Sequence, residues 1–353
     1  MEEAPPLLTV RARCTCGPAD PFVRTTITRR TPGPHDVLIK IAFAGICHSD
    51  IDHARSTRGS TMYPLVPGHE VAGTVLAVGS SVTRFRPGDR VGVGNIVDAC
   101  RTCQNCRDGL EQYCATRVLA YNALGYDGER TYGGYSEKTV VDERFVVRIP
   151  ASIAMDKAAP LLCAGITMYS PLRHWKVGPG SRVGIVGFGG LGHVGVQMSK
   201  ALGAHTTVLD LSEAKRADAV RLGADAYVLA SDNAAFASLA GSLDLVISTV
   251  NGDVLDPYVG LLAVDGVLVN LSIPAKPLTV SGAALLANRR SIAGTRSGGM
   301  AETQEMLDFC ALHGIAAEVE VIHADDIDAA YRRLLAGDVR FRFVIDNRTL
   351  SET

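Results

Sequence analysis

The sequence predicts an α/β protein that combines a doubly wound parallel sheet with a second, mostly β domain. Three observations indicate this class. The length of 353 residues suits two domains. The first part of the chain holds short β-branched runs broken by glycine and proline, such as 36–41, 71–78 and 90–93. The later part alternates short apolar runs with helical stretches, which is typical of a parallel sheet covered on both faces.

The alternating part begins at about residue 155, and its rhythm sets the expected boundaries. The expected strands are 182–186, 205–209, 226–229, 243–248, 266–271 and 291–294. A helix at 303–310 and a closing strand at 342–345 follow the last of them. We therefore expect a mostly β domain at 1–154, the parallel sheet at 155–294, and a return of residues 295–353 to the first domain.

Composition excludes several classes of protein. Lysine plus arginine (35) nearly balances aspartate plus glutamate (37), so neither nucleic acid nor a membrane surface is an expected partner. The start, Met1-Glu2-Glu3, lacks the basic and apolar pattern of a signal peptide. We expect a cytoplasmic protein, where disulfides are rare. The nine cysteines then favour metal ligation or catalysis.

Four of the cysteines lie close together, in the pattern Cys100-x2-Cys103-x2-Cys106-x7-Cys114. Thiolates suit tetrahedral zinc, and a closed set of four leaves no position for a substrate, so we predict a structural zinc site. An iron–sulfur cluster and disulfides are the alternatives. A bacterial ferredoxin run ends in Cys-x3-Cys-Pro, whereas here the last gap is seven residues and Ala115 follows.

Three further ligand candidates, Cys47, His69 and Cys163, are scattered along the chain. Two cysteines and one histidine form a catalytic type of zinc set, whose fourth position stays open to water or substrate. Each residue alone is a weak indication, because a single cysteine is most often a small buried hydrophobe. Cys14, Cys16 and Cys310 remain without a predicted role.

Together these motifs resemble the zinc-dependent medium-chain alcohol dehydrogenases, and most of all their cinnamyl alcohol dehydrogenase branch. The motifs are Cys47-His48-Ser49-Asp50, Gly68-His69-Glu70, the four-cysteine loop, Leu162-Cys163-Ala164-Gly165 and Phe343-Val344-Ile345-Asp346-Asn347. The resemblance implies a GroES-like catalytic domain with two zinc ions per chain. It implies Cys47, His69 and Cys163 as catalytic ligands and Glu70 as an occasional alternative ligand. It also implies that Asp50 fixes a histidine ligand. A solvated carboxylate at Glu70 and a turn residue at Asp50 are the plainer interpretations.

A glycine-rich turn, Gly187-Phe188-Gly189-Gly190-Leu191-Gly192, follows the expected strand 182–186 and precedes a helical stretch. In this context Gly-x-Gly-x-x-Gly predicts a dinucleotide site, since the glycines admit the pyrophosphate and the helix start supplies N–H donors. Gly187, Gly189, Gly190, Leu191 and Gly192 are therefore candidate cofactor contacts. Residues 155–294 become a Rossmann domain.

Asp210 ends the second strand of this domain. A carboxylate there can accept hydrogen bonds from the ribose hydroxyls and repels a 2′-phosphate, so we expect NAD rather than NADP. The cinnamyl branch usually carries small hydroxyl residues at this position and uses NADP. This sequence departs from the pattern of that branch at Asp210 but keeps Ser212, Lys215 and Arg216, which could still hold a phosphate.

The expected reaction is hydride transfer between the nicotinamide and a primary alcohol or aldehyde, aromatic or medium-chain, with zinc as the Lewis acid. The family moves the alcohol proton through a Ser or Thr two residues after the first cysteine ligand, here Ser49, and a histidine three residues later. That histidine position holds Asp52, and His53 follows it. His53 could reach in through a local distortion, Asp52 or water could replace the histidine, or no relay is needed.

Two other functions stay open. Loss of the relay would suit reduction of an iminium or a conjugated alkene, and a non-enzymatic zinc- and nucleotide-binding module is the plainest alternative. The family resemblance also implies a small-molecule substrate and a homodimer joined through edge strands near 291–295.

Overall fold

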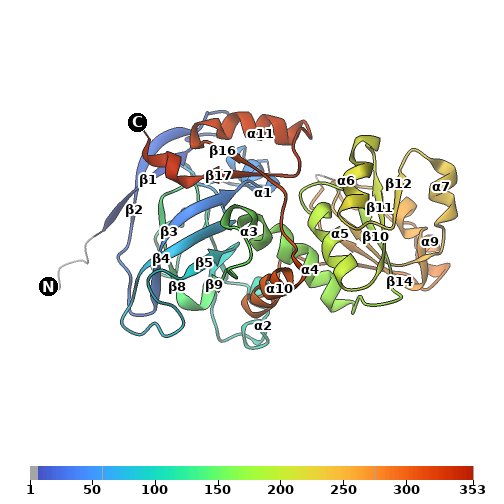
Figure 1. Cartoon of the computed structure of the whole chain (residues 1–353), viewed down its shortest axis with the longest axis horizontal. Helices are drawn as coiled ribbons and strands as arrows, with labels where there is room; N and C mark the ends of the chain where they lie inside the picture. Colours follow the sequence, from blue (N-terminus) through green and yellow to red (C-terminus); the bar gives the residue numbers. More distant parts are fainter. Residues whose placement is uncertain (1–6, 58, 275, 353) are drawn as a thin grey trace. The chain divides into compact units, whose positions relative to one another are not determined.

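The computed structural model describes residues 7–57, 59–274 and 276–352 (Figure 1). The chain divides into two compact units. The first unit contains Met1–Cys163 and Gly298–Thr353, and the second contains Ala164–Ser297. The boundaries expected from the sequence were 154/155 and 294/295, whereas the two units meet at 163/164 and 297/298.

A seven-stranded sheet forms the framework of the first unit. Its strands follow the order β16-β17-β3-β4-β5-β9, with β8 paired to β3. The bounds are β3 Asp36–Gly45, β4 Val71–Val78, β5 Arg90–Val93, β8 Lys138–Asp142, β9 Val147–Arg148, β16 Val319–Ile322 and β17 Arg342–Asp346. Because β3 and β4 are antiparallel, with Ala44 opposite Val71, the chain leaves β3 beside the point where it enters β4. Residues just after β3 and just before β4 are therefore brought together.

Two small two-stranded sheets complete the β structure of this unit. They are β1 (Leu8–Cys14) with β2 (Val23–Arg29), and β6 (Ile96–Asp98) with β7 (Val118–Leu119). The helices of the unit are α1 His48–Ala54, α2 Gln104–Arg107, α3 Met155–Ala158, α10 Met300–His313 and α11 Ile327–Leu335. Buried side chains of β1, β3, β17 and α11 share one core, and those of β4 and β5 share a second core with the other face of β3.

The second unit is a six-stranded sheet in the order β12-β11-β10-β13-β14-β15, and every pairing is parallel. The strands are β10 Arg182–Val186, β11 His205–Asp210, β12 Ala226–Leu229, β13 Leu243–Ser248, β14 Leu262–Asn270 and β15 Ser291–Gly294. This is the doubly wound order in which the chain reverses between its first and fourth strands, here β10 and β13. Ligands bind at such a reversal, beyond the carboxyl ends of the strands.

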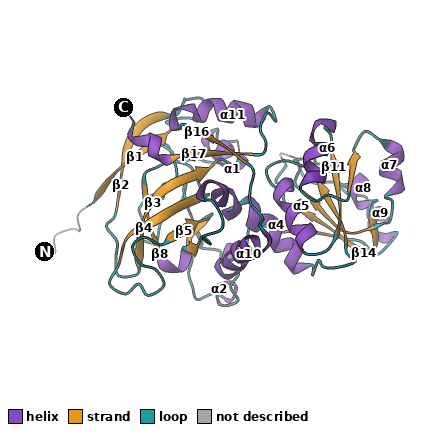
Figure 2. Ribbon diagram, viewed as in Figure 1, coloured by secondary structure: helices purple, strands orange, loops and turns teal. Residues whose placement is uncertain are grey.

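Helices cover the parallel sheet on both faces, with α5 and α6 on one side and α8 and α9 on the other (Figure 2). The helices are α4 Ala164–His174, α5 Gly192–Ala201, α6 Arg216–Arg221, α7 Asn233–Ser238, α8 Asp256–Val259 and α9 Gly282–Leu286. The predicted fold class, a Rossmann sheet with a mostly β domain, is confirmed. The largest difference is in β14, which begins at Leu262 rather than 266, because Leu262 already pairs with Leu243 before a register shift leads into the pairing of Val267 with Leu245. The other strands of the parallel sheet differ from the expected ranges by at most one residue.

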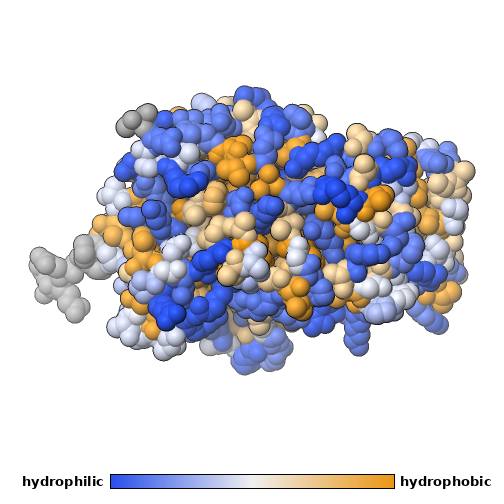
Figure 3. Space-filling model, viewed as in Figure 1, coloured by the Kyte–Doolittle hydropathy of each residue, from blue (hydrophilic) through white to orange (hydrophobic). Residues whose placement is uncertain are grey.

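Hydrophilic side chains cover most of the visible face, and apolar side chains form small groups on it (Figure 3). Among the described residues, we find no helix with the length and apolar character that a membrane span requires.

Candidate active site and metal centres

The exit of β3 and the entry of β4 carry most of a compact ligand cluster. Cys47 caps the N-terminus of α1, directly after β3. His69 and Glu70 precede β4, and Cys163 ends the segment that leads into the second unit. One potential ligand atom from each of these four residues lies within 4.8 Å of the others. The antiparallel β3–β4 pair thus joins residues that the sequence separates.

Asp50 holds this arrangement together from inside. Its side chain is fully buried. Oδ2 accepts the Cys47 N–H at 2.9 Å, and Oδ1 accepts the Gly68 N–H at 3.1 Å. Oδ1 also lies 3.2 Å from His69 Nδ1. A carboxylate needs a donor there, so this contact places the proton on Nδ1 and leaves Nε2 as a free lone pair facing the cluster.

The spacing of these ligand atoms fits a zinc ion. Cys47 Sγ and Cys163 Sγ are 3.9 Å apart, and His69 Nε2 is 3.3 Å from Cys163 Sγ. Zinc–sulfur bonds of about 2.3 Å give a tetrahedron with sulfur–sulfur edges of about 3.8 Å. The hydrogen bond from Cys163 holds the pKa of the Cys47 thiol well below its usual range. The site thus favours at least one thiolate, the form that binds metals.

Glu70 faces a cation that sequence reasoning missed. The carboxylate is fully buried, and it pairs with the guanidinium of Arg342, of which 2% is exposed. Arg342 begins β17, which pairs with β3 at Gly45. A side chain at Gly45 would lie 2.0 Å from Glu70 Oε2, so glycine is needed there to admit the carboxylate. Burial raises the pKa of Glu70 to about 7 although Arg342 opposes the shift.

The four-cysteine set forms the second cluster. Its sulfur atoms lie within 4.8 Å of one another, and Cys100 Sγ is 3.9 Å from Cys106 Sγ. This spacing again matches an edge of a zinc–sulfur tetrahedron. The backbone N–H of Thr102 is the first of several donors that lower the pKa of Cys100 to about 5. Three of the cysteines pack against the core of β4 and β5, so the loop is attached to the sheet at this cluster.

The residues proposed for the proton relay lie in α1 and point different ways. Ser49 is half-buried in the first turn. Asp52 Oδ1 accepts the hydroxyl of exposed Thr57 at 3.0 Å. The His53 ring packs edge-on against Tyr121 at 5.3 Å, and the Tyr121 ring lies 5.9 Å from that of His69. His53 is therefore on the Tyr121 side of the helix, toward the ligand cluster.

In the second unit, the glycine-rich turn connects β10 to α5. Gly187 has a φ of +91°, and a side chain there would lie 2.5 Å from Thr249 Oγ1 just after β13. A side chain at Gly192 would lie 2.1 Å from the Gly187 carbonyl oxygen. At Gly189 a Cβ would meet no described atom within 4 Å. Protein atoms thus pack closely against Gly187 and Gly192, whereas space remains beside Gly189, which fits the close approach of a dinucleotide. Gly190 and Leu191 complete the turn.

The carboxylate of Asp210 accepts hydrogen bonds from the protein's own backbone. The residue ends β11 and is 8% exposed. Its Oδ2 accepts the Phe188 N–H at 2.6 Å, and its Oδ1 accepts the Ser212 N–H at 2.9 Å. Lys215 Nζ lies 3.6 Å from Oδ2. The carboxylate therefore ties the glycine-rich turn to β11, and the Lys215 ammonium offsets its charge.

Replacing Arg342 with Met should leave the buried Glu70 carboxylate without its counter-ion and lower the unfolding free energy. At about pH 8.5 we expect the metal-loaded variant to lose about 3–5 kcal/mol of unfolding free energy, because one partner of a buried pair is gone. Without the guanidinium the pKa of Glu70 rises further, so the folded protein takes up a proton that the unfolded chain does not. The loss should therefore be smaller at about pH 6, as measured by urea unfolding.

The double variant Glu70→Gln/Arg342→Met should recover most of the loss, whereas Arg348→Met removes an ion pair with Asp346 whose arginine is 71% exposed and should cost under about 1 kcal/mol. An equal loss for Arg342→Met at both pH values would contradict the assignment.

Known proteins resemble the chain along nearly its whole length. It is 55% identical over 345 residues to the NADP-dependent alcohol dehydrogenase C 1 of Mycolicibacterium smegmatis, covering 97% of this chain and 99% of that protein. A cinnamyl alcohol dehydrogenase of Sorghum bicolor superposes with a TM-score of 0.95 at 42% identity, covering 98% and 100%. The CAD of Helicobacter pylori, solved with NADP(H), has a TM-score of 0.91 at 38% identity, covering 97% and 99%.

These relatives correct the cofactor expected from Asp210. The preference for NAD over NADP was wrong: the mycobacterial relative is named for NADP, and the Helicobacter structure contains NADP(H). The rule assumes a carboxylate free to face the ribose. Here the Asp210 oxygens accept backbone N–H groups and lie near Lys215, so the residue type alone misled.

Two family models match the two halves of the chain. The alcohol dehydrogenase GroES-like domain matches residues 33–151, and the zinc-binding dehydrogenase model matches residues 190–311. These matches agree with the two clusters of metal-binding side chains and with the doubly wound sheet. The chain belongs to the zinc-dependent medium-chain alcohol dehydrogenase family.

Proposed function

We propose that the protein is an NADP(H)-dependent aldehyde reductase and alcohol dehydrogenase for aromatic or medium-chain substrates, with one catalytic and one structural zinc ion. The observation that carries the proposal is the cluster of Cys47, His69, Glu70 and Cys163, whose ligand atoms have the spacing of a zinc site. The names of the related enzymes support the substrate class and the cofactor.

In the reductive direction, a hydride leaves the nicotinamide for the carbonyl carbon, and a proton reaches the carbonyl oxygen to give the alcohol. Zinc, when bound by Cys47, His69 and Cys163, would supply the Lewis acidity that polarises the carbonyl. The chain's own work is to fix the ligands. Asp50 sets the His69 tautomer, and Arg342 pairs with Glu70 Oε1, which lies 4.0 Å from His69 Nε2.

For the proton path we favour His53 over Asp52. Asn122 Oδ1 accepts the Met62 N–H, so its Nδ2 is a donor, and it lies 2.9 Å from His53 Nδ1. Nδ1 must then accept, and the ring carries its proton on Nε2. A fixed tautomer beside Tyr121 suits proton transfer toward Ser49 and the site, whereas Asp52 accepts a hydrogen bond from exposed Thr57.

For the cofactor we propose that Lys215 and Ser212 hold the 2′-phosphate of NADP. Lys215 is the cation beside Asp210, and Ser212 lies in the same turn. The neighbouring Arg216 is engaged with Glu213 and with the Tyr227 carbonyl oxygen. Gly187, Gly189, Gly190, Leu191 and Gly192 would line the pyrophosphate site.

Two wider expectations go with the family. We propose a homodimer joined through β15, because this strand lies at the edge of its sheet and the residues of β15 pair only with β14 among the described strands. A cytoplasmic location stays a prediction, which the metal-type use of the cysteines favours. Reduction of an iminium or conjugated alkene is the second candidate, favoured only by Asp52 at the usual histidine position.

A cysteine substitution in one cluster should mainly lower activity, and one in the other cluster should mainly lower stability. The wild type should consume NADPH with benzaldehyde and bind two zinc ions per chain. Cys163→Ala should lower kcat/KM by about 10³-fold or more, since Lewis acidity contributes several kcal/mol, and should lose one zinc with little change in Tm. Cys106→Ala should lower Tm strongly, because metal binding is coupled to folding of its loop. Full activity in Cys163→Ala would contradict the proposal.

Lys215→Ala should change cofactor choice. We expect the KM for NADPH to rise at least about tenfold, which is about 1.4 kcal/mol, and the KM for NADH to change little, since only NADPH carries the 2′-phosphate. Arg216→Ala is the matched control and should leave both constants nearly unchanged, because its guanidinium is used within the protein. Equal effects of the two substitutions would show that Lys215 does not select the phosphate.

His53→Ala should lower kcat for benzaldehyde reduction by about 10²-fold and remove a titration from the pH–rate profile, as expected for a group that transfers a proton. Asp52→Asn should leave kcat for benzaldehyde within about threefold of the wild type, because a residue outside the proton path transfers no proton. The reverse order of effects would assign the relay to Asp52. No effect of either variant on aldehydes, with turnover of a cyclic iminium, would favour the second candidate function.

A further inference from the structure

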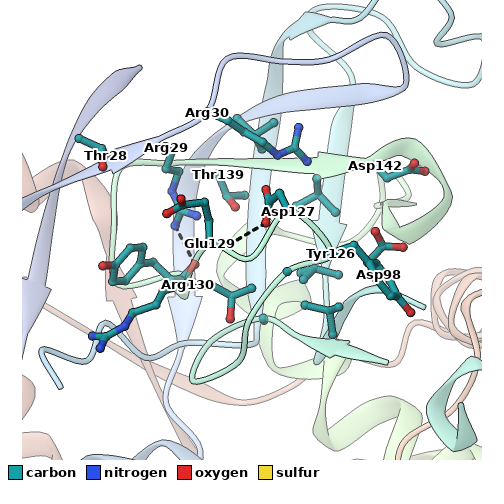
Figure 4. Close-up of a pocket in the computed structure, with 18 of the residues that line it drawn as sticks. Thr28, Arg29, Arg30, Asp98, Tyr126, Asp127, Glu129, Arg130, Thr139 and Asp142 are labelled. Atoms are coloured by element: carbon teal, nitrogen blue, oxygen red, sulfur yellow. Dashed lines mark hydrogen bonds between the residues drawn. The ribbon is translucent and has the colours of Figure 1, made fainter. Parts of the chain in front are cut away.

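A cavity lies in the first unit, outside both clusters of metal-binding side chains. Its volume is about 600 Å³, within the usual range for small-molecule sites. Figure 4 shows Thr28, Arg29 and Arg30 at the end of β2 on one wall, and Asp127 and Glu129, from the loop between β7 and β8, across from them. Apolar side chains, including Val97, Val118 and Val141, line the rest of this β2–β8 cavity.

Arg29 is an unusual member of this wall, because its charge has only neutral partners. Nη2 donates to the carbonyl oxygens of Tyr132 at 2.8 Å and Gly133 at 3.1 Å, and to Ser136 Oγ at 3.0 Å. Nε is buried with no hydrogen-bond partner among the described residues. No carboxylate of the described chain forms an ion pair with Arg29. A partly buried cation normally has a counter-ion, so this one lacks its usual compensation.

The other charges of the cavity are already used or lie at its rim. Arg30 forms a two-point pair with Asp36. Asp98 and Asp142 both pair with Arg101. Asp127 and Glu129 are exposed and lie at the rim of the cavity, where they form no ion pair with Arg29. Arg130, the remaining cation, is exposed and donates to the Tyr63 carbonyl oxygen. Among the described lining residues, Arg29 is thus the partly buried charge that has no ion-pair partner. Burial also lowers the pKa of Arg29, to about 10, which is the direction expected for a desolvated guanidinium.

We infer that the β2–β8 cavity binds a small monoanion with an apolar body, a carboxylate or a sulfonate, whose head group pairs with Arg29. A guanidinium can pair with the two oxygens of a carboxylate, or with two of the three oxygens of a sulfonate. The valine-lined part of the cavity would take the apolar body. The acidic rim of Asp127 and Glu129 would repel a second negative charge, so multiply charged anions such as sulfate should be excluded. This inference does not rest on the proposed function.

The test uses pentane-1-sulfonate as the probe, because a sulfonate is not a substrate for hydride transfer. The zinc-loaded enzyme, saturated with NADPH, is titrated by isothermal calorimetry with the probe, with methyl pentyl sulfone as its uncharged match, and with inorganic sulfate. We expect saturable binding of pentane-1-sulfonate only, and no competition by it against benzaldehyde in steady-state kinetics. No saturable binding, or competition with the aldehyde, would overturn the inference.

Two variants locate the site. Arg29→Gln should weaken binding of pentane-1-sulfonate at least tenfold, and Arg86→Gln, whose arginine is 88% exposed, should leave it unchanged. Because Arg29→Gln could disturb the loop that Arg29 holds, a steric variant is also needed. Thr28→Trp fills the cavity from an exposed position and should also weaken binding, whereas Thr26→Trp, on the same face of β2 but outside the cavity, should not. Unchanged binding in both Arg29→Gln and Thr28→Trp would exclude this cavity.

Discussion

One buried carboxylate, Asp50, connects the residues of the cluster formed by Cys47, His69, Glu70 and Cys163. It accepts the N–H of Cys47 on one side and of Gly68 on the other, and it orients His69. These contacts join the start of α1 to the approach of β4, so the two ligands are fixed by the backbone as well as by the sheet. A carboxylate buried this completely is stable only because each oxygen has donors. The ligand geometry and the satisfaction of Asp50 are therefore one constraint.

The four-cysteine loop and the Rossmann sheet could be predicted from the sequence, because each is marked by residues close together in the chain. Thiolates at fixed spacing indicate a metal site whatever the surrounding fold, and Cys100 to Cys114 lie in one loop. The Rossmann sheet followed from strand-length apolar runs and from a glycine turn at the right place. Arg342 could not be found in this way, because its contact with Glu70 joins residues 272 positions apart and depends on β17 pairing with β3. No periodicity in the sequence records that pairing.

Asp210 shows a different limit of sequence reasoning. Its position at the end of β11 was predicted, but its effect on the cofactor depends on where its oxygens point. Two backbone N–H groups and the Lys215 ammonium surround the carboxylate. A charge compensated in this way repels a phosphate less than a free carboxylate does. The residue that marks NAD in many doubly wound domains here connects the glycine-rich turn to β11.

The four-cysteine cluster has consequences beyond its own loop. Asp98, which lines the β2–β8 cavity, precedes the cluster, and Val118 follows it in β7. Tyr126, another lining residue, donates its hydroxyl to the Thr116 carbonyl oxygen at 2.8 Å, two residues after Cys114. One side of the cavity is therefore built on chain that the cluster anchors. Metal binding there would order this wall together with the loop, because both depend on the same short stretch of backbone.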